Sequence, residues 1–307
     1  MPIDSQNMWL VLAFVSASLL GLYDVVKKIS LDNNAVIPVL FLNIFFCCVL
    51  FLPVIILSWF FPQTIQGTLF WLPPIHAGAH GLLFLKALIV LASWIFAYFS
   101  LKHLPITIAS PIKATQPILT LLGAMLIFGE RLNFYQWIGV LIAIISFYLL
   151  SWSGKKEGIS FTHNKWIYFM VLAVVTGSLS GLYDKYLMAR LDRMNVQVWY
   201  NFYQLLVMGI ILLALWYPKR HTSTKFQWKN SIPLISLLLI LADFAYFYAL
   251  SYEDSMISIV SLVRRSGVVV SFIAGALWFK EKNLKAKFID LLLVLLGMYF
   301  IYLGSKA

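Results

Sequence analysis

The clearest pattern along the chain is a series of apolar runs of about 20 residues, separated by short polar segments. A helix of that length spans the ~30 Å hydrocarbon core of a bilayer. The runs therefore predict an all-α integral membrane protein with ten transmembrane helices. Their expected positions are residues 8–28, 36–60, 80–101, 105–128, 133–152, 166–189, 195–217, 231–251, 255–279 and 284–303. The uncharged, proline-containing stretch 61–79 is expected to lie along the membrane interface.

Two halves of the chain repeat one another. The tetrapeptide GLYD occurs at 21–24 and at 181–184, and Asn43 aligns with Asn201. Lys113 aligns with Arg264 and Glu130 with Glu281, both at a separation of 151 residues. We expect a first five-helix repeat at 1–152, a linker at 153–164 and a second repeat at 165–307. Because five is odd, the second repeat starts on the opposite membrane face, and such inverted repeats are typical of alternating-access transporters.

Composition excludes a soluble protein, since 62% of the residues are hydrophobic and 11% charged, against roughly half and a quarter in soluble domains. The net charge of +11 lies mostly in short loops, which is typical of segments retained in the cytosol and not of a nucleic-acid groove. Fourteen Lys and Arg residues fall on one face and four on the face that holds both termini. This count predicts termini outside the cytosol. The N-terminus lacks the basic region of a cleaved signal, so the first apolar run is expected to remain as a helix.

The remaining five basic residues fall within the expected helices, and a central charge there usually faces a cavity. They are Lys86, Lys113, Lys185, Arg264 and Arg265. Lys113 and Arg264 enter from opposite faces to depths of about 12 and 13 Å at 1.5 Å per residue. A pair of cations around one cavity suits an anionic solute. Alternatively, Asp243 neutralises one of them, with Lys86 taking part. Arg265 points about 100° away from Arg264 on an ideal helix.

Two prolines, Pro111 and Pro117, bracket Lys113. Each removes an N–H and crowds the carbonyl four residues back, so we expect a kinked helix lining a cavity, or a kink that serves packing alone. Further candidates for the cavity wall are polar and aromatic residues inside helices. These are Asn43, Trp94, Tyr98, Asn201, Tyr203 and Tyr246.

Four acidic residues, and the tyrosines beside two of them, are candidate gating or structural elements. Glu130 and Glu281 stand at helix exits, where they would cap the next helix or pair with Arg131 and Lys282. The other two are the GLYD aspartates. Asp24, beside Tyr23, has Lys27 and Lys28 at i+3 and i+4. Asp184, beside Tyr183, has only apolar residues there and needs water or a partner such as Arg264 or Arg265. We therefore expect Asp184→Asn to change transport more than Asp24→Asn.

No enzyme motif is present, whether nucleophile elbow, P-loop or thiolate cluster. The adjacent Cys47 and Cys48 are expected to be core residues. We expect no metal site and no cofactor, and without a nucleotide-binding motif any uphill transport is driven by ion coupling or exchange. The sequence leaves the oligomeric state open, with a monomer among the possibilities.

The segment PILTLLGAMLIFGERLNFYQWIGVLIAIISFYLL, with Gly129–Glu130 and Gly139, resembles the EamA branch of the drug/metabolite transporter superfamily. The second copy departs from it with Lys280 before Glu281 and with Asp290 in place of the early glycine. IKATQP at 112–117 and LVRRSGVVVSF at 262–272 are similar to the matching helices of triose-phosphate and related organophosphate translocators. This similarity implies that Lys113, Arg264 and Arg265 hold a substrate phosphate. Gln116 stands where that group usually has an acid.

The resemblance implies a membrane transporter with both termini in the cytosol, whereas the charge count predicts the opposite orientation. The leading hypothesis is a secondary transporter of an anionic organic solute, such as a phosphate- or carboxylate-bearing metabolite, in a bacterial inner membrane. The alternative is an exporter of neutral or amphipathic metabolites, with the basic residues neutralised by Asp24, Asp184 and Asp243. Its expected partners are the lipid bilayer and a small-molecule substrate, and not nucleic acid.

Overall fold

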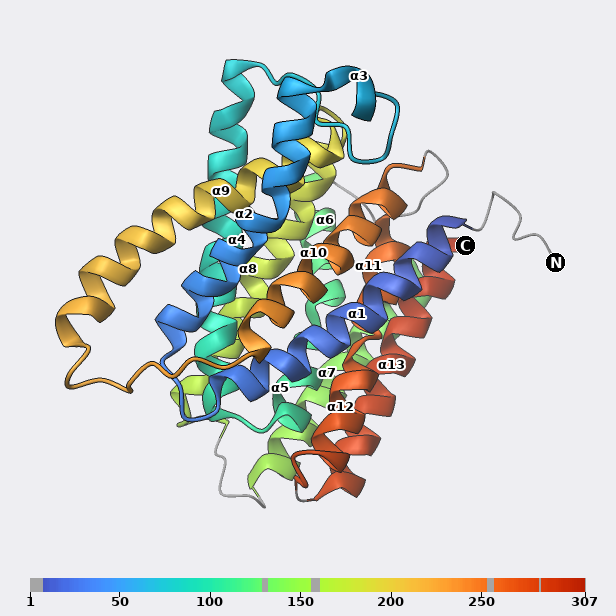
Figure 1. Cartoon of the computed structure of the whole chain (residues 1–307). Helices are drawn as coiled ribbons and strands as arrows, with labels where there is room; N and C mark the ends of the chain where they lie inside the picture. Colours follow the sequence, from blue (N-terminus) through green and yellow to red (C-terminus); the bar gives the residue numbers. More distant parts are fainter. Residues whose placement is uncertain (1–7, 129–131, 156–160, 253–256, 282, 307) are drawn as a thin grey trace.

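A computed structural model describes residues 8–128, 132–155, 161–252, 257–281 and 283–306, and these residues form an all-helical bundle (Figure 1). The first half contains α1 (Met8–Leu31), α2 (Val36–Phe60), α3 (Pro62–Ile65), α4 (Ala77–His103), α5 (Ile106–Ala114), α6 (Gln116–Phe128) and α7 (Phe134–Lys155). The second contains α8 (Lys165–Met188), α9 (Arg193–Ile211), α10 (Ser231–Leu250), α11 (Ile257–Arg265), α12 (Val268–Leu277) and α13 (Leu284–Lys306). A π-helical turn, η2 (Leu212–Trp216), and a 3-10 turn, η3 (Tyr217–Lys219), extend α9.

The ten apolar runs each correspond to helix, which confirms the expected fold class. Seven helices in the described ranges are long and apolar enough to cross a membrane. The fourth run is divided into α5 and α6, and the ninth into α11 and α12. The stretch 61–79 contains the short helix α3, a loop and the first residues of α4. Many large apolar side chains are exposed on the outside of the bundle, as expected where the surrounding solvent is lipid.

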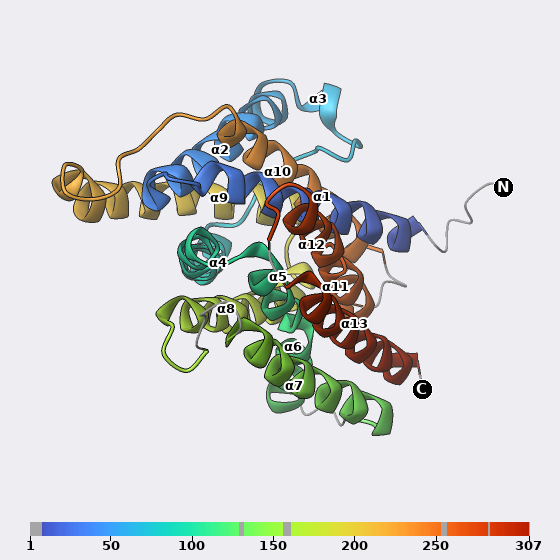
Figure 2. The same ribbon diagram turned by 90° about the horizontal axis from the view of Figure 1, so that it is seen from below.

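The helices pair across the two halves. α1 packs along α10 and α8 along α4, so the first helix of each half contacts the third helix of the other half. The broken helix α11–α12 packs on α1, and its counterpart α5–α6 packs on α8. α7 and α13, the last helix of each half, also pack together (Figure 2). Each contact has an equivalent in which the halves exchange roles, which is the arrangement that an inverted repeat requires.

Hydroxyl groups fix the register of these helix pairs inside the apolar bundle. On α4, Ser100 donates to the carbonyl of Trp166 at 2.8 Å, and Ser93 donates to the carbonyl of Ala173 at 2.8 Å. The two contacts advance in opposite directions along the two chains, so α4 and α8 are antiparallel. Such bonds satisfy polar side chains that lipid cannot solvate. The free thiols Cys47 and Cys48 are buried in the apolar core, as expected.

Candidate functional site

The two broken helices are interrupted at equivalent places and in the same way. α5 ends at Ala114, and the hydroxyl of Thr115 donates to the carbonyl of Ile112 at 2.7 Å. α11 ends at Arg265, and the hydroxyl of Ser266 donates to the carbonyl of Val263 at 2.6 Å. Both interruptions are thus closed by a hydroxyl group that bonds the carbonyl three residues back.

The prolines account for the first interruption but not for the second. Pro117 lacks the N–H that would bond the carbonyl of Lys113, so the expected kink is confirmed next to this residue. The second interruption has no proline and contains Gly267, which packs against α1. A Cβ atom on Gly267 would overlap the carbonyl oxygen of Ala17. The backbone contact at the interrupted helix therefore requires glycine.

A cavity of about 130 Å³ lies where the two halves meet, lined by residues from both. Every residue that the sequence assigned to substrate contact lines it, namely Lys86, Trp94, Lys113, Gln116, Asp243, Tyr246, Arg264 and Arg265. Three of the expected gating or structural residues line it as well, namely Tyr23, Pro117 and Asp184. Four others lie outside this lining, namely Asp24, Pro111, Tyr183 and Glu281, and Glu130 lies outside the described residues.

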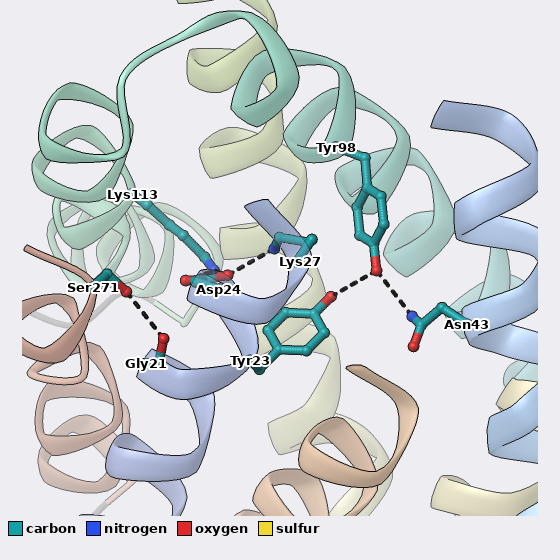
Figure 3. Close-up of polar contacts among 8 residues, drawn as sticks. All are labelled: Gly21, Tyr23, Asp24, Lys27, Asn43, Tyr98, Lys113 and Ser271. Carbon is teal, nitrogen blue, oxygen red and sulfur yellow. Dashed lines mark hydrogen bonds and ion pairs between the residues drawn. The ribbon is translucent and has the colours of Figure 1, made fainter. Parts of the chain in front are cut away.

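One charged cluster joins α1 to the end of α5 (Figure 3). Asp24 accepts from Lys113 at 2.6 and 2.8 Å and from Lys27 at 2.7 Å. The ammonium of Lys27 also lies 4.3 Å from the ring centroid of Tyr23, within the range of a cation–π contact. Asp24 is therefore shared between two lysines, one on its own helix and one from the interrupted helix.

The burial of Lys27 changes the count of basic residues on the two membrane faces that was made from the sequence. This lysine was counted with the loop residues, but its side chain is 3% exposed and lines the cavity. Lys287, counted on the same face, is fully buried in α13. Lys28, the other expected neighbour of Asp24, instead donates to the carbonyls of Leu101 and Leu104, both at 2.6 Å.

A second charged cluster lies in the same cavity on α4, α8, α10 and α11. Lys86 lies 2.5 Å from Asp184 and donates to the hydroxyl of Ser180 at 2.6 Å. Arg264 pairs with Asp243, the neutralising partner that the sequence left as an alternative. Asp184 thus pairs with Lys86 and with neither arginine.

Aromatic hydroxyl and ring contacts hold the second cluster in place. Tyr200 donates to Asp243 at 3.0 Å. The guanidinium of Arg264 lies 4.0 Å from the ring centroid of Tyr246. In the part of the chain that the structure describes, no carboxylate lies within ion-pair distance of Arg265. Within the described ranges, Arg265 thus brings to the cavity a charge that has no ion-pair partner.

Glu281 ties the two halves together beyond the cavity. Its carboxylate accepts from the backbone N–H groups of Ile106 and Thr107 at 2.7 and 2.9 Å, and from the hydroxyl of Thr107. It therefore caps α5, a helix of the other half, and not the next helix; Lys282, the alternative partner, lies outside the described residues. A carboxylate at this position also interacts favourably with the helix dipole.

Some cavity residues were missed by the sequence analysis. Tyr200 and Ser180 carry no charge and stand in apolar helices, so only their three-dimensional neighbours identify them. Lys27 carried a usable signal, its spacing of three residues from Asp24. Tyr98 lines the cavity as expected, and Asn43 lies behind it as a hydrogen-bond donor. Asn201 and Tyr203 are described residues outside the lining.

Comparisons with known proteins agree with this architecture. The model of the EamA-like transporter family matches residues 7–152 and 164–303. An uncharacterized transporter of Archaeoglobus fulgidus is 28% identical over 188 residues, which are 61% of this chain and 63% of that relative. The chain thus spans less than two thirds of the relative's length. A crystal structure at 13% identity superposes with a TM-score of 0.65, over 99% of this chain and 100% of the other. At that identity the likeness shows the fold alone.

Proposed function

Because the chain belongs to the EamA-like transporter family, and is therefore a multi-pass membrane transporter and not an enzyme, we propose that it carries a small anionic organic solute by alternating access. A phosphate or a carboxylate is the proposed anionic group. The solute binds in the cavity between the two halves, and the halves exchange conformations around it.

The observation that carries this proposal is the charge balance of the cavity. Among the described residues, five cationic side chains line it: Lys27, Lys86, Lys113, Arg264 and Arg265. They are opposed by three carboxylates, those of Asp24, Asp184 and Asp243. Among these described side chains two positive charges are in excess, because Lys27 and Lys113 share one carboxylate and Arg265 pairs with none of the three. Uncompensated charge inside a membrane is costly, and an anionic solute would balance it.

The size and construction of the cavity support the same proposal. A cavity of about 150 Å³ accommodates benzene in an engineered lysozyme, so 130 Å³ suits a solute of a few heavy atoms. The helix interruptions border the cavity at Lys113 and Arg265. Discontinuous helices commonly form substrate sites in transporters with inverted repeats.

The proposal is tested by reconstitution in proteoliposomes and uptake of sugar phosphates, dicarboxylates and neutral amino acids. We expect an anionic compound to be the best substrate. Lys113→Ala and Arg264→Ala are then expected to reduce its uptake strongly, and Lys185→Ala to serve as a control, since Lys185 does not line the cavity. Full transport by both cavity variants would contradict the proposed anion site.

A second candidate is the export of neutral or amphipathic metabolites. It is favoured by the ion pairs themselves, since four of the five cations already contact carboxylates. The same uptake panel separates the candidates. Transport of a neutral amino acid with no competition by phosphate or dicarboxylates would favour the second.

We propose a bacterial inner membrane as the location, with ion coupling or exchange as the driving force. For the orientation, the charge count remains twelve to four after Lys27 and Lys287 are removed, which supports termini outside the cytosol, although the family resemblance implies cytosolic termini. A single cysteine introduced at Thr222, in the loop before α10, distinguishes the two by its labelling with a membrane-impermeant maleimide in intact cells.

A further inference from the structure

A chain of hydrogen bonds runs from α2 into the cavity. The amide of Asn43 donates to the hydroxyl oxygen of Tyr98 at 3.0 Å, and the hydroxyls of Tyr98 and Tyr23 lie 3.3 Å apart (Figure 3). Behind them, the hydroxyl of Ser236 contacts the carbonyl and the side-chain oxygen of Asn43 at 2.9 and 3.1 Å. Asn43, Ser236 and Tyr98 are fully buried. The chain is therefore anchored at its α2 end and reaches the cavity at Tyr23.

The hydroxyl hydrogens in this series of hydrogen bonds can be matched to acceptors one by one. Tyr98 accepts from Asn43, and its own hydrogen has to be used within the protein because the side chain is 0% exposed. Either hydroxyl of this pair can donate, and we assign the donor to Tyr98, the less exposed of the two, with the oxygen of Tyr23 as its acceptor. The hydrogen of Tyr23 then has no acceptor among the described residues. Since Tyr23 lines the cavity, this hydrogen is available to a solute.

The surroundings of Tyr23 determine which solute oxygen suits it. Lys27 lies 4.3 Å from its ring centroid and Lys113 lies 6.0 Å from it. Both ammonium groups share the single carboxylate of Asp24. A hydroxyl donor beside an excess of positive charge is suited to a charged oxygen, because hydrogen bonds to ionised acceptors are roughly twice as strong as neutral ones.

The second half does not repeat this arrangement. Tyr183, the repeat equivalent of Tyr23, donates to the carbonyl of Leu82 at 3.2 Å. Asn201, the equivalent of Asn43, donates to the carbonyl of Gln197 on its own helix at 2.7 Å. At these two equivalent positions the second half thus offers no matching donor, and this difference distinguishes one end of the cavity from the other.

We propose that Tyr23 donates a hydrogen bond to an anionic oxygen of the solute, and that Tyr98 and Asn43 are positioning residues that direct this donor. This inference rests on the function proposed above. It identifies the solute as an oxyanion, carboxylate or phosphate, whose charged oxygen faces α1.

The test is calorimetric titration of the purified protein with inorganic phosphate and with succinate. Tyr23→Phe keeps the ring and removes the donor, so we expect about ten- to hundredfold weaker binding, the range for a lost bond to a charged acceptor. Tyr98→Phe and Asn43→Leu are each expected to weaken binding less. Tyr168→Phe is the matched control, because Tyr168 is exposed and donates to the carbonyl of Thr162 away from the cavity.

A positioning role is distinguished from a structural one by whether the losses of binding from two substitutions are additive. Tyr98→Phe is expected to add little to Tyr23→Phe, because both remove the same donor contact. Gel filtration and thermal unfolding check that each variant is folded, and Tyr98→Phe and Asn43→Leu keep the test decisive if Tyr23→Phe does not fold. Wild-type binding that Lys113→Ala abolishes and Tyr23→Phe leaves unchanged overturns this inference alone. Failure of the wild-type protein to bind either anion overturns the proposed function as well.

Discussion

The ammonium of Lys113 lies 2.6 Å from Oδ2 of Asp24, and this contact connects the interrupted fourth membrane segment to the GLYD sequence of the first. The repeat equivalents of these residues, Arg264 and Asp184, do not pair with each other. Arg264 pairs with Asp243, and Asp184 with Lys86. The two halves therefore use equivalent residues in different ion pairs.

Asp24→Asn is expected to destabilise the protein more than Asp184→Asn does. The first change leaves two lysines without a carboxylate, and the second leaves one. Breaking a buried ion pair costs about 3–5 kcal/mol when one partner remains charged. Thermal unfolding in detergent measures the difference, and equal midpoints would contradict it.

The expectation that Asp184→Asn alters transport more than Asp24→Asn stays a prediction, but its original basis has changed. Both aspartates contact a lysine from another helix, so neither is free to change partners without breaking an ion pair. Initial uptake rates, normalised to the amount of folded protein, test it.

The pair Lys86 and Asp184 is suited to a double-mutant cycle. Lys86→Met and Asp184→Asn each leave a buried charge unpaired, whereas the double variant removes both charges. We therefore expect the double variant to be more stable than the less stable single variant. The free energy of unfolding of the four proteins gives the coupling, and additive losses would contradict a direct pair.

The two GLYD glycines offer a matched comparison between the repeats. A Cβ on Gly21 would lie 2.5 Å from the carbonyl oxygen of Gly267 and 2.7 Å from Cβ of Val270, whereas a Cβ on Gly181 would meet nothing within 4 Å. Gly21→Ala is expected to destabilise by about 1–3 kcal/mol, as overpacking commonly does. Gly181→Ala is expected to be neutral or stabilising, since Ala favours helix. Similar losses in both would indicate that the close contact with α12 is absent.

Glu281→Ala is expected to loosen the start of α5. It removes the acceptor of two backbone N–H groups and of the Thr107 hydroxyl, and loss of a helix cap costs about 0.5–2 kcal/mol. Hydrogen exchange at Ile106 and Thr107 is expected to become faster. Lys285→Ala is the control, because Lys285 is exposed. Unchanged exchange at both backbone sites would show that Glu281 does not cap α5.

Much of the architecture follows from the sequence, because the lengths of the apolar runs and the odd number of helices in each repeat constrain it directly. The charged residues inside the helices also indicated which side chains line the cavity, since an intramembrane lysine or arginine needs a polar environment. The partners were harder to assign. Asp184 contacts Lys86 because α8 and α4 are antiparallel neighbours, a relation between helices that no local spacing encodes. The interruption at Ser266 was likewise missed, since it has a hydroxyl and a glycine in place of the proline signal.

The contacts at the two interrupted helices also determine which halves of this molecule fit together. The amide of Gln116 fills the space that a Cβ on Gly177 would need, and Gly267 leaves space for the backbone at Ala17. A dimer of two first halves would press Gln116 against the methyl group of Ala17. One built from two second halves would set Gly267 opposite Gly177 and leave a gap. The duplicated halves have thus become complementary instead of interchangeable, so fragments expressed separately should assemble as unlike pairs.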